Sequence, residues 1–169
     1  MNRLLRIFKH RWLDETDARR ALPAPALARI EAAVVQSEQG HSGEIRVCVE
    51  AGLPLSYLWR GATARDRALA MFGKLRVWDT EQNNGVLIYL LLAERRIEIV
   101  ADRGIDRRVP AAHWQTLVDG MAAAFRGGDF EAGLTAAIGH ADAVLRTHFP
   151  LPDRGRNPNE LPDAPVLVL

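Results

Sequence analysis

An almost unbroken apolar run, GVLIYLLL at 85–92, limits most strongly what this chain can fold into. It shows no alternation between apolar and polar residues, so both faces of a strand formed there are expected to be buried, as in the middle of a layered sheet. The polar turn AERR follows, and RIEIVA at 96–101 alternates. The pattern predicts a central hairpin of two antiparallel strands.

A further strand is predicted upstream, where GEIRVCVE alternates strictly between apolar and polar residues. This period of two is typical of a strand, here over 44–50, with its apolar face covered and its polar face open. Cys48 belongs to the polar face. It is expected to be a small, partly buried side chain rather than a nucleophile.

Apolar residues at intervals of three and four predict the helices. These fall at 14–39, interrupted at Pro23 and Pro25, and at 63–75, 111–126 and 130–149, whereas 51–61 is irregular. A strand, a helix and a strand in succession, followed by a hairpin and two helices, indicate an α/β layered domain. The helical crossover makes the first two strands parallel if they share one sheet.

The chain divides into an N-terminal segment at 1–24, an α/β domain at 25–149 and a C-terminal arm at 150–169. The arm holds five of the nine prolines and is expected to be extended or flexible. Its apolar end, VLVL, is a candidate to pair with a sheet edge or to dock in a groove.

The N-terminal segment is basic and amphipathic, with apolar residues at helical spacing. These residues are Leu4, Leu5, Phe8 and Trp12. Two interpretations remain open. The segment is either a terminal helix packed on its own domain, or a peripheral contact of residues 3–12 with an anionic membrane surface.

Composition excludes several classes of protein. A formal charge of +1 gives no general attraction to nucleic acid, and one cysteine allows neither an intramolecular disulfide nor a Cys-rich zinc site. No apolar run reaches the roughly 18 to 20 residues of a membrane span, and no signal peptide is recognisable. We therefore expect a cytoplasmic protein. Without a G-x-G-x-x-G motif after a strand, we expect no nucleotide cofactor.

Connectivity predicts that three polar segments meet at one edge of the sheet. Parallel first and second strands start at the same edge, and an antiparallel third strand ends there. HSG at 41–43, WDTEQNN at 78–84 and DRGID at 102–106 would then share a rim whose oxygen atoms suit Ca²⁺, or Mg²⁺ as the alternative. The candidate metal ligands are Asp79, Glu81, Asn83, Asn84, Asp102 and Asp106. The other rim residues are His41, Ser42, Thr80 and Arg103.

The same rim admits two other interpretations. It could be an ordinary capped turn, in which Asp102 and Arg103 form a surface ion pair and Gly104 bends the chain. It could instead hydrolyse phosphate monoesters with the help of a metal ion. In that case the catalytic candidates Asp79 and Asp102 would act as ligand, base or nucleophile.

The stretches TEQNNGVLIYLLLAERRIEIVADRGI and FRGGDFEAGL resemble the TPM domain family, with the likeness extending over about 27–149. This family includes plant thylakoid proteins of photosystem repair and many bacterial proteins. The resemblance implies a Rossmann-like three-layer α/β/α sandwich. Some members bind calcium at the rim, and a plant member has been assigned acid phosphatase activity. Many members carry lysine and aspartate just before NGVL. Thr80 and Asn83 stand there in this chain, which weakens both the metal and the phosphatase expectations.

This chain is similar to the short, soluble bacterial members, whose genes often neighbour those for LemA-like and longer TPM proteins. The resemblance therefore implies a binding or assembly module with a protein partner of that kind. Such a module would act beside a membrane-associated complex, in the cytoplasm or at the periphery of the inner membrane. Metal-assisted acid phosphatase activity is the alternative function.

Overall fold

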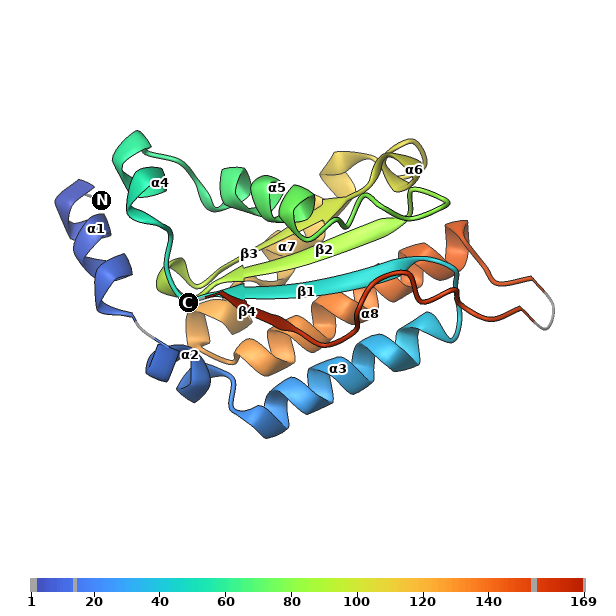
Figure 1. Ribbon diagram of the computed structural model, residues 1–169, viewed down its shortest axis with the longest axis horizontal. Coiled ribbons are helices and arrows are strands. Elements are labelled where there is room, and N and C mark those ends of the chain that lie inside the picture. Colours follow the sequence, from blue (N-terminus) through green and yellow to red (C-terminus); the bar gives the residue numbers. More distant parts are fainter. Residues whose placement is uncertain (1–2, 14, 153–154, 169) are drawn as a thin grey trace.

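The computed structural model describes residues 3–13, 15–152 and 155–168 and consists of one mixed sheet between two layers of helices (Figure 1). The predicted three-layer α/β/α sandwich is thus confirmed. In space the four strands of the sheet lie in the order β3-β2-β1-β4. Their bounds are β1 Glu44–Glu50, β2 Gly85–Leu91, β3 Arg96–Ala101 and β4 Val166–Val168.

The strand register confirms the predicted connectivity. β1 and β2 run parallel from the pair Glu44 and Gly85, and β2 and β3 run antiparallel, with Val86 opposite Ala101. The hairpin turns through a short 3₁₀ helix, η1 (Leu92–Glu94), and Arg95 with a left-handed φ of 50°. β2 is central in the sheet and β3 is at its edge. The starts of β1 and β2 and the end of β3 therefore share one edge.

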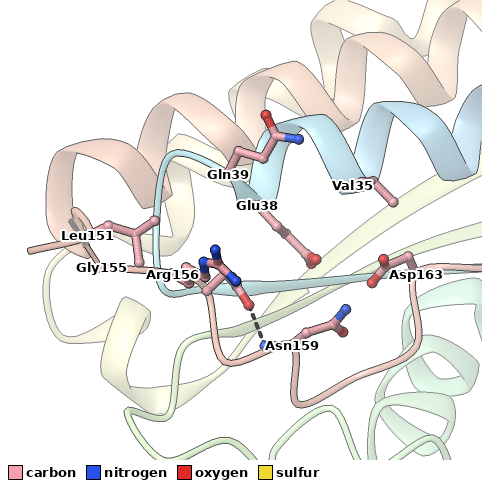
Figure 2. A pocket seen from close by; sticks show the side chains of 9 residues that line it. Val35, Glu38, Gln39, Leu151, Gly155, Arg156, Asn159 and Asp163 are labelled. Atoms are coloured by element: carbon pink, nitrogen blue, oxygen red, sulfur yellow. Dashed lines mark hydrogen bonds between the residues drawn. The ribbon is translucent and has the colours of Figure 1, made fainter.

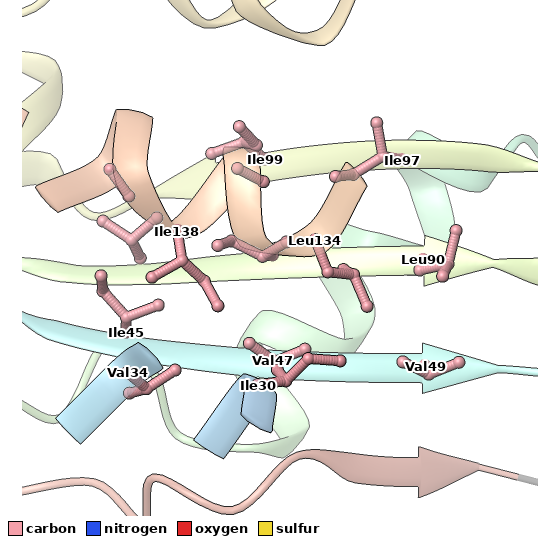
Figure 3. Close-up of a cluster of buried hydrophobic side chains, with 14 of the residues drawn as sticks. Ile30, Val34, Ile45, Val47, Val49, Leu90, Ile97, Ile99, Leu134 and Ile138 are labelled. Carbon is pink, nitrogen blue, oxygen red and sulfur yellow. The ribbon is translucent and has the colours of Figure 1, made fainter. Parts of the chain in front are cut away.

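One face of the sheet is covered by α3 (Ala24–Glu38), α7 (Ala111–Gly127) and α8 (Phe130–His148). Figure 3 shows isoleucine, leucine and valine side chains of α3, α8 and the strands packed against one another in this layer. The ends of these helices carry typical capping residues. Pro23 is the N-cap of α3, Gly128 ends α7 with a φ of 87°, and Asp129 caps α8 by accepting a hydrogen bond from the N–H of Ala132.

The opposite face is covered by α5 (Ala64–Lys74) and α4 (Leu55–Arg60). α5 begins with a capping box between Thr63 and Asp66. α4 was not predicted, because the sequence 51–61 has too short an apolar pattern to indicate a helix. Pro54 starts α4 and Gly61, with a φ of 71°, ends it.

The expectation that β1 has an open polar face is wrong, because every residue of β1 is buried. Glu50 is bound by Arg67 of α5 and by the hydroxyl of Tyr89 in β2. Arg46 donates to the backbone oxygens of Pro162 and Ala164 in the C-terminal arm. Glu50 and Arg46 of this face are thus paired inside the protein rather than solvated.

The described parts of both terminal segments pack on the domain. The arm passes beside β1 and ends as β4, which pairs in parallel with 48–50 of β1, so VLV joins the sheet edge. At the other end, α1 (Arg3–Trp12) packs on the domain and is followed by α2 (Glu15–Ala21). Residue 14, the start of the helix predicted over 14–39, lies outside the described residues.

Candidate functional site

The loop before β2 is held by a hydrogen bond within the loop and by its backbone conformation. The hydroxyl of Thr80 accepts a hydrogen bond from the N–H of Asn84 at 3.0 Å, and Asn83 between them has a left-handed φ of 52°. Asparagine tolerates this conformation better than most residues do. Gly85 follows, and a Cβ there would lie 2.0 Å from the carbonyl oxygen of Val77. The loop therefore holds Asn84 in one position at the start of β2.

Asn84 joins this loop to the segment before β1. Its Nδ2 donates to the carbonyl oxygen of Ser42 at 3.0 Å and lies 3.3 Å from the Ser42 hydroxyl. The side chain is fully buried, and its Oδ1 accepts no hydrogen bond from any residue that the structure describes. The hydrogen bonds of Nδ2 thus fix the orientation of the Asn84 amide group. They leave Oδ1 without a partner among the described residues.

Asp102 occupies the matching place at the end of β3. Its N–H donates to the carbonyl oxygen of Gly85 at 2.9 Å, which places it beside Asn84. Its Oδ1 accepts from the N–H of Arg103 at 2.7 Å and so caps the short helix α6 (Arg103–Asp106). Its Oδ2 is buried and has no hydrogen-bond partner among the described residues.

The two loops of the rim are held against each other. The N–H of Gly104 donates to the carbonyl oxygen of Asn83 at 2.9 Å, and a Cβ on Gly104 would approach that oxygen to 2.5 Å. The guanidinium of Arg103 donates to Asn83 Oδ1 at 2.6 Å. Arg103 therefore ties the loops together and does not form the ion pair with Asp102 that the capped-turn interpretation expected.

The other predicted ligands lie further out. Asp79, Glu81 and Asp106 are exposed, so of the two catalytic candidates only Asp102 is buried. Partial burial raises the pKa of Asp106, and the charge of Arg65 acts against this rise. Across 3–13, 15–152 and 155–168, no group of three or more His, Cys, Asp or Glu side chains is arranged to hold a metal ion. The six predicted ligands therefore do not form one ready-made cage.

His41 points away from the rim. Its ring is fully buried, with Nδ1 donating to the carbonyl oxygen of Gly43 at 3.0 Å and Nε2 lying 2.9 Å from the hydroxyl of Ser37. Burial lowers its pKa, against the charge of nearby Asp142. Because both ring nitrogens are engaged, His41 supports the backbone before β1 and offers no free nitrogen to a cation.

The C-terminal arm contributes two residues to the rim that local sequence patterns do not predict. Asn157 donates to the carbonyl oxygens of His41 and Gly43, at 2.9 and 3.0 Å. The carboxylate of Glu160 accepts from the N–H of Glu81 at 2.9 Å. The sequence indicates only that the arm is extended and rich in proline. This does not predict which residues of the arm lie against the rim.

Behind the rim, α3 and the arm enclose a pocket of about 330 Å³ (Figure 2). The carboxyl groups of Glu38 and Asp163 point toward each other across it. Burial raises the pKa of Glu38 to about 8, the hydrogen bond from Ile45 N–H lowers it, and the charges of Glu44 and Asp163 raise it further. The pocket therefore holds a carboxyl group that stays protonated at neutral pH.

The rim is suited to coordination by oxygen atoms. A buried polar atom without a partner costs about 1–3 kcal/mol, and most such atoms in native proteins have one. Here two of them, Asn84 Oδ1 and Asp102 Oδ2, lie on adjacent strand ends. One is neutral and one carries charge, a donor set that a hard cation accepts from amides and carboxylates. The residues present thus fit a partly hydrated divalent cation better than a fully protein-bound one.

Comparison with known proteins agrees with this architecture. A family model described as the TPM domain matches residues 16–144. The chain is similar to the BA42 protein of the psychrophilic bacterium Bizionia argentinensis, whose NMR structure superposes with a TM-score of 0.73. The two share 30% identity over 86% of this chain and 94% of that one. No curated protein is significantly similar.

A second solved structure shows the fold alone. This is the N-terminal domain of a protein from P. gingivalis, determined by solution NMR, which superposes with a TM-score of 0.60. Its identity with this chain is 20%, over 76% of this chain and 79% of that one.

Proposed function

Because the chain belongs to the TPM domain family, we propose that it is a binding module of the TPM type whose rim takes up a divalent cation, with Ca²⁺ preferred over Mg²⁺. The observation that carries this proposal is the pair of buried oxygens, Asn84 Oδ1 and Asp102 Oδ2, that no described residue satisfies. In each side chain the other polar atom fixes the orientation of the group. Asn84 Nδ2 donates to the carbonyl oxygen of Ser42, and Asp102 Oδ1 accepts from the N–H of Arg103.

Asn84 and Asp102 would hold the cation, and water would complete its shell. Ca²⁺ takes six to eight oxygen ligands in flexible geometry and accepts amide carbonyl oxygens beside carboxylates and water, which matches the pair of Asn84 Oδ1 and Asp102 Oδ2. Mg²⁺ is the alternative, because it keeps several waters and binds through one or two carboxylates. The exposed carboxylates of Asp79, Glu81 and Asp106 add negative charge around the site. They raise the local concentration of cations without being fixed ligands.

A cation with few protein ligands has positions left for a partner. We propose that the partner is a protein that supplies an acidic side chain to the bound ion and contacts the exposed residues of the rim. LemA-like and longer TPM membrane proteins are the first candidates to test. The role of this chain's own residues is to orient two oxygens and to keep the two loops rigid, as Arg103 does through Asn83.

Thermal unfolding during a calcium titration tests the cation site. Asp102→Asn removes the charge and the unpaired oxygen but keeps Oδ1 to accept the Arg103 N–H. Asp119→Asn is the matched control, because Asp119 is exposed on α7, outside the rim. Calcium at 100 times its Kd stabilises a protein by about 2.7 kcal/mol, which for a chain of this size raises Tm by roughly 5–10 °C.

We expect this rise in the wild type and in Asp119→Asn and not in Asp102→Asn. An unchanged wild-type Tm at millimolar calcium would refute the proposal. A full rise in Asp102→Asn would show that calcium binds elsewhere. The same titration with magnesium should give a smaller rise.

A further inference from the structure

Helix α1 docks on the domain through its less apolar side. Arg6 donates to Glu94 at 2.8 Å and to the carbonyl oxygen of Ala62 at 2.7 Å. His10 is buried, and its Nδ1 accepts from the N–H of Leu53 at 2.9 Å, so its Nε2 carries the proton and donates to Glu94 at 3.1 Å. These hydrogen bonds hold the pKa of Glu94 at about 2, although its burial acts in the other direction.

The packing around these hydrogen bonds is close. A Cβ on Gly52 would lie 2.6 Å from the carbonyl oxygen of His10, so only glycine lets the helix approach the end of β1 this closely. Ile7 packs against the apolar cluster between the sheet, α4 and α5. The orientation of α1 about its own axis is therefore fixed by contacts on one side.

The opposite side of α1 is apolar and faces solvent. It carries four large side chains with exposed fractions of 63–81%. Helix α4, which contacts α1 (Figure 1), adds two more with exposed fractions of 53% and 68%. We call these six residues the apolar end patch: Leu4, Leu5, Phe8, Trp12, Leu55 and Trp59. A helix that served only to cover its own domain would bury this face.

The charged side chains of the two helices that carry the apolar end patch are all basic. Lys9 and Arg11 of α1 and Arg60 of α4 are exposed, and neither helix contains an aspartate or a glutamate. A second copy of the chain would place these cations against one another, which disfavours a symmetric dimer. Cations, tryptophans and aliphatic side chains without acidic residues fit the interface of a bilayer with anionic lipids.

We propose that the apolar end patch docks this protein on the surface of an anionic phospholipid bilayer. Phe8, Trp12 and their neighbours enter the region between headgroups and acyl chains, and Lys9 and Arg11 contact lipid phosphates. None of the described helices combines the length and hydrophobicity needed to cross a membrane. The docking is therefore interfacial. It places the carboxyl ends of β1 and β2 toward the lipid and the rim at the far end of the sheet (Figure 1).

This proposal is independent of the cation site and is tested by vesicle flotation of the full chain without calcium. The vesicles are phosphatidylcholine alone, or phosphatidylcholine with phosphatidylglycerol. The double variant Phe8→Ser/Trp12→Ser removes apolar anchors that are exposed in the folded protein, and Trp78→Ser removes a 47% exposed tryptophan beside the rim as a control. Circular dichroism of each variant verifies that it is folded.

We expect the wild type and Trp78→Ser to float with anionic vesicles, and the double variant to bind at least about tenfold more weakly. Lys9→Glu/Arg11→Glu should lose binding to a similar degree, and high salt should weaken the wild type. Absence of wild-type flotation, or equal flotation of the double variant, would overturn the proposal. So would a dimer in sedimentation experiments that depends on Phe8 and Trp12, because a second copy would then cover the patch.

Discussion

The buried carboxyl of Glu38 makes a quantitative prediction about stability and pH. The side chain is 5% exposed at the end of α3, and one oxygen accepts from the N–H of Ile45 at 2.9 Å. Burial raises its pKa from 4.5 to about 8. Glu38→Gln keeps an oxygen that can accept from the N–H of Ile45 and is close to the acid in size, yet it cannot ionise.

The sign follows from proton binding in the two states. Between pH 4.5 and about 8 the unfolded chain has released the Glu38 proton while the folded protein retains it, so the free energy of unfolding falls as pH rises. The contribution of the protonated Glu38 carboxyl to the free energy of unfolding is fully present below pH 4.5 and is lost as the pH rises through about 8. Each pH unit in this interval changes the free energy of unfolding by up to about 1.4 kcal/mol, which gives a total on the order of 5 kcal/mol.

Urea unfolding at pH 5, 6, 7 and 8 measures this effect as a difference between variants. His41 acts in the opposite direction because burial lowers its pKa, but it is common to all variants and cancels. We expect Glu38→Gln to match the wild type near pH 5 and to exceed it by several kcal/mol at pH 8. Glu31→Gln, an exposed position on the same helix, should follow the wild type at every pH. Parallel curves for Glu38→Gln and the wild type would refute the reasoning.

Three further predictions concern the scaffold. Gly85→Ala should lower the free energy of unfolding, measured in urea titrations, by about 3 kcal/mol, because the new Cβ would lie 2.0 Å from a backbone oxygen. The control Gly73→Ala, which has open space around it, should stabilise the protein slightly. Glu50→Gln should cost roughly 3–5 kcal/mol, because it leaves the guanidinium of Arg67 buried without its anion, and calorimetry measures this loss. Cys48 should resist a thiol reagent until the protein unfolds, since it is fully buried and burial raises its pKa to about 12; rapid labelling of the native protein would contradict this.

Local patterns predicted most of the sheet and failed where distant segments meet. The hairpin of β2 and β3 and the parallel pairing of β1 and β2 follow from periodicity and connectivity, and both are confirmed. The covered second face of β1 could not be predicted. Arg46 alternates as a surface residue would, and its partners Pro162 and Ala164 lie more than a hundred residues away in the arm.

The N-terminal helix shows the same limit. Its apolar spacing predicted a face that includes Phe8 and Trp12. The contacts that orient α1 come from Arg6 and His10, whose partner Glu94 lies in the hairpin turn. Periodicity locates an apolar face but does not tell which side of the helix the domain will bind.

For the candidate site, the sequence predicted the convergence of the three rim segments but not the atoms that remain available. Connectivity placed Ser42, Asn84 and Asp102 together, as the hydrogen bonds confirm. The availability of an oxygen depends on which hydrogen bonds its neighbours take. Asp102 Oδ2 remains unpaired for two reasons. The backbone N–H of Arg103 at the start of α6 donates to Oδ1, and the guanidinium of Arg103 donates to Asn83 instead.

The most direct test of the rim is a calcium titration followed by ¹H–¹⁵N NMR spectra of the uniformly labelled wild-type protein. The account predicts saturable shifts of the side-chain amide of Asn84 and of the backbone N–H groups of Ser42, Asp102 and Arg103, with the rest of the spectrum nearly unchanged. An absence of shifts at millimolar calcium would contradict it. So would shifts confined to the pocket around Glu38.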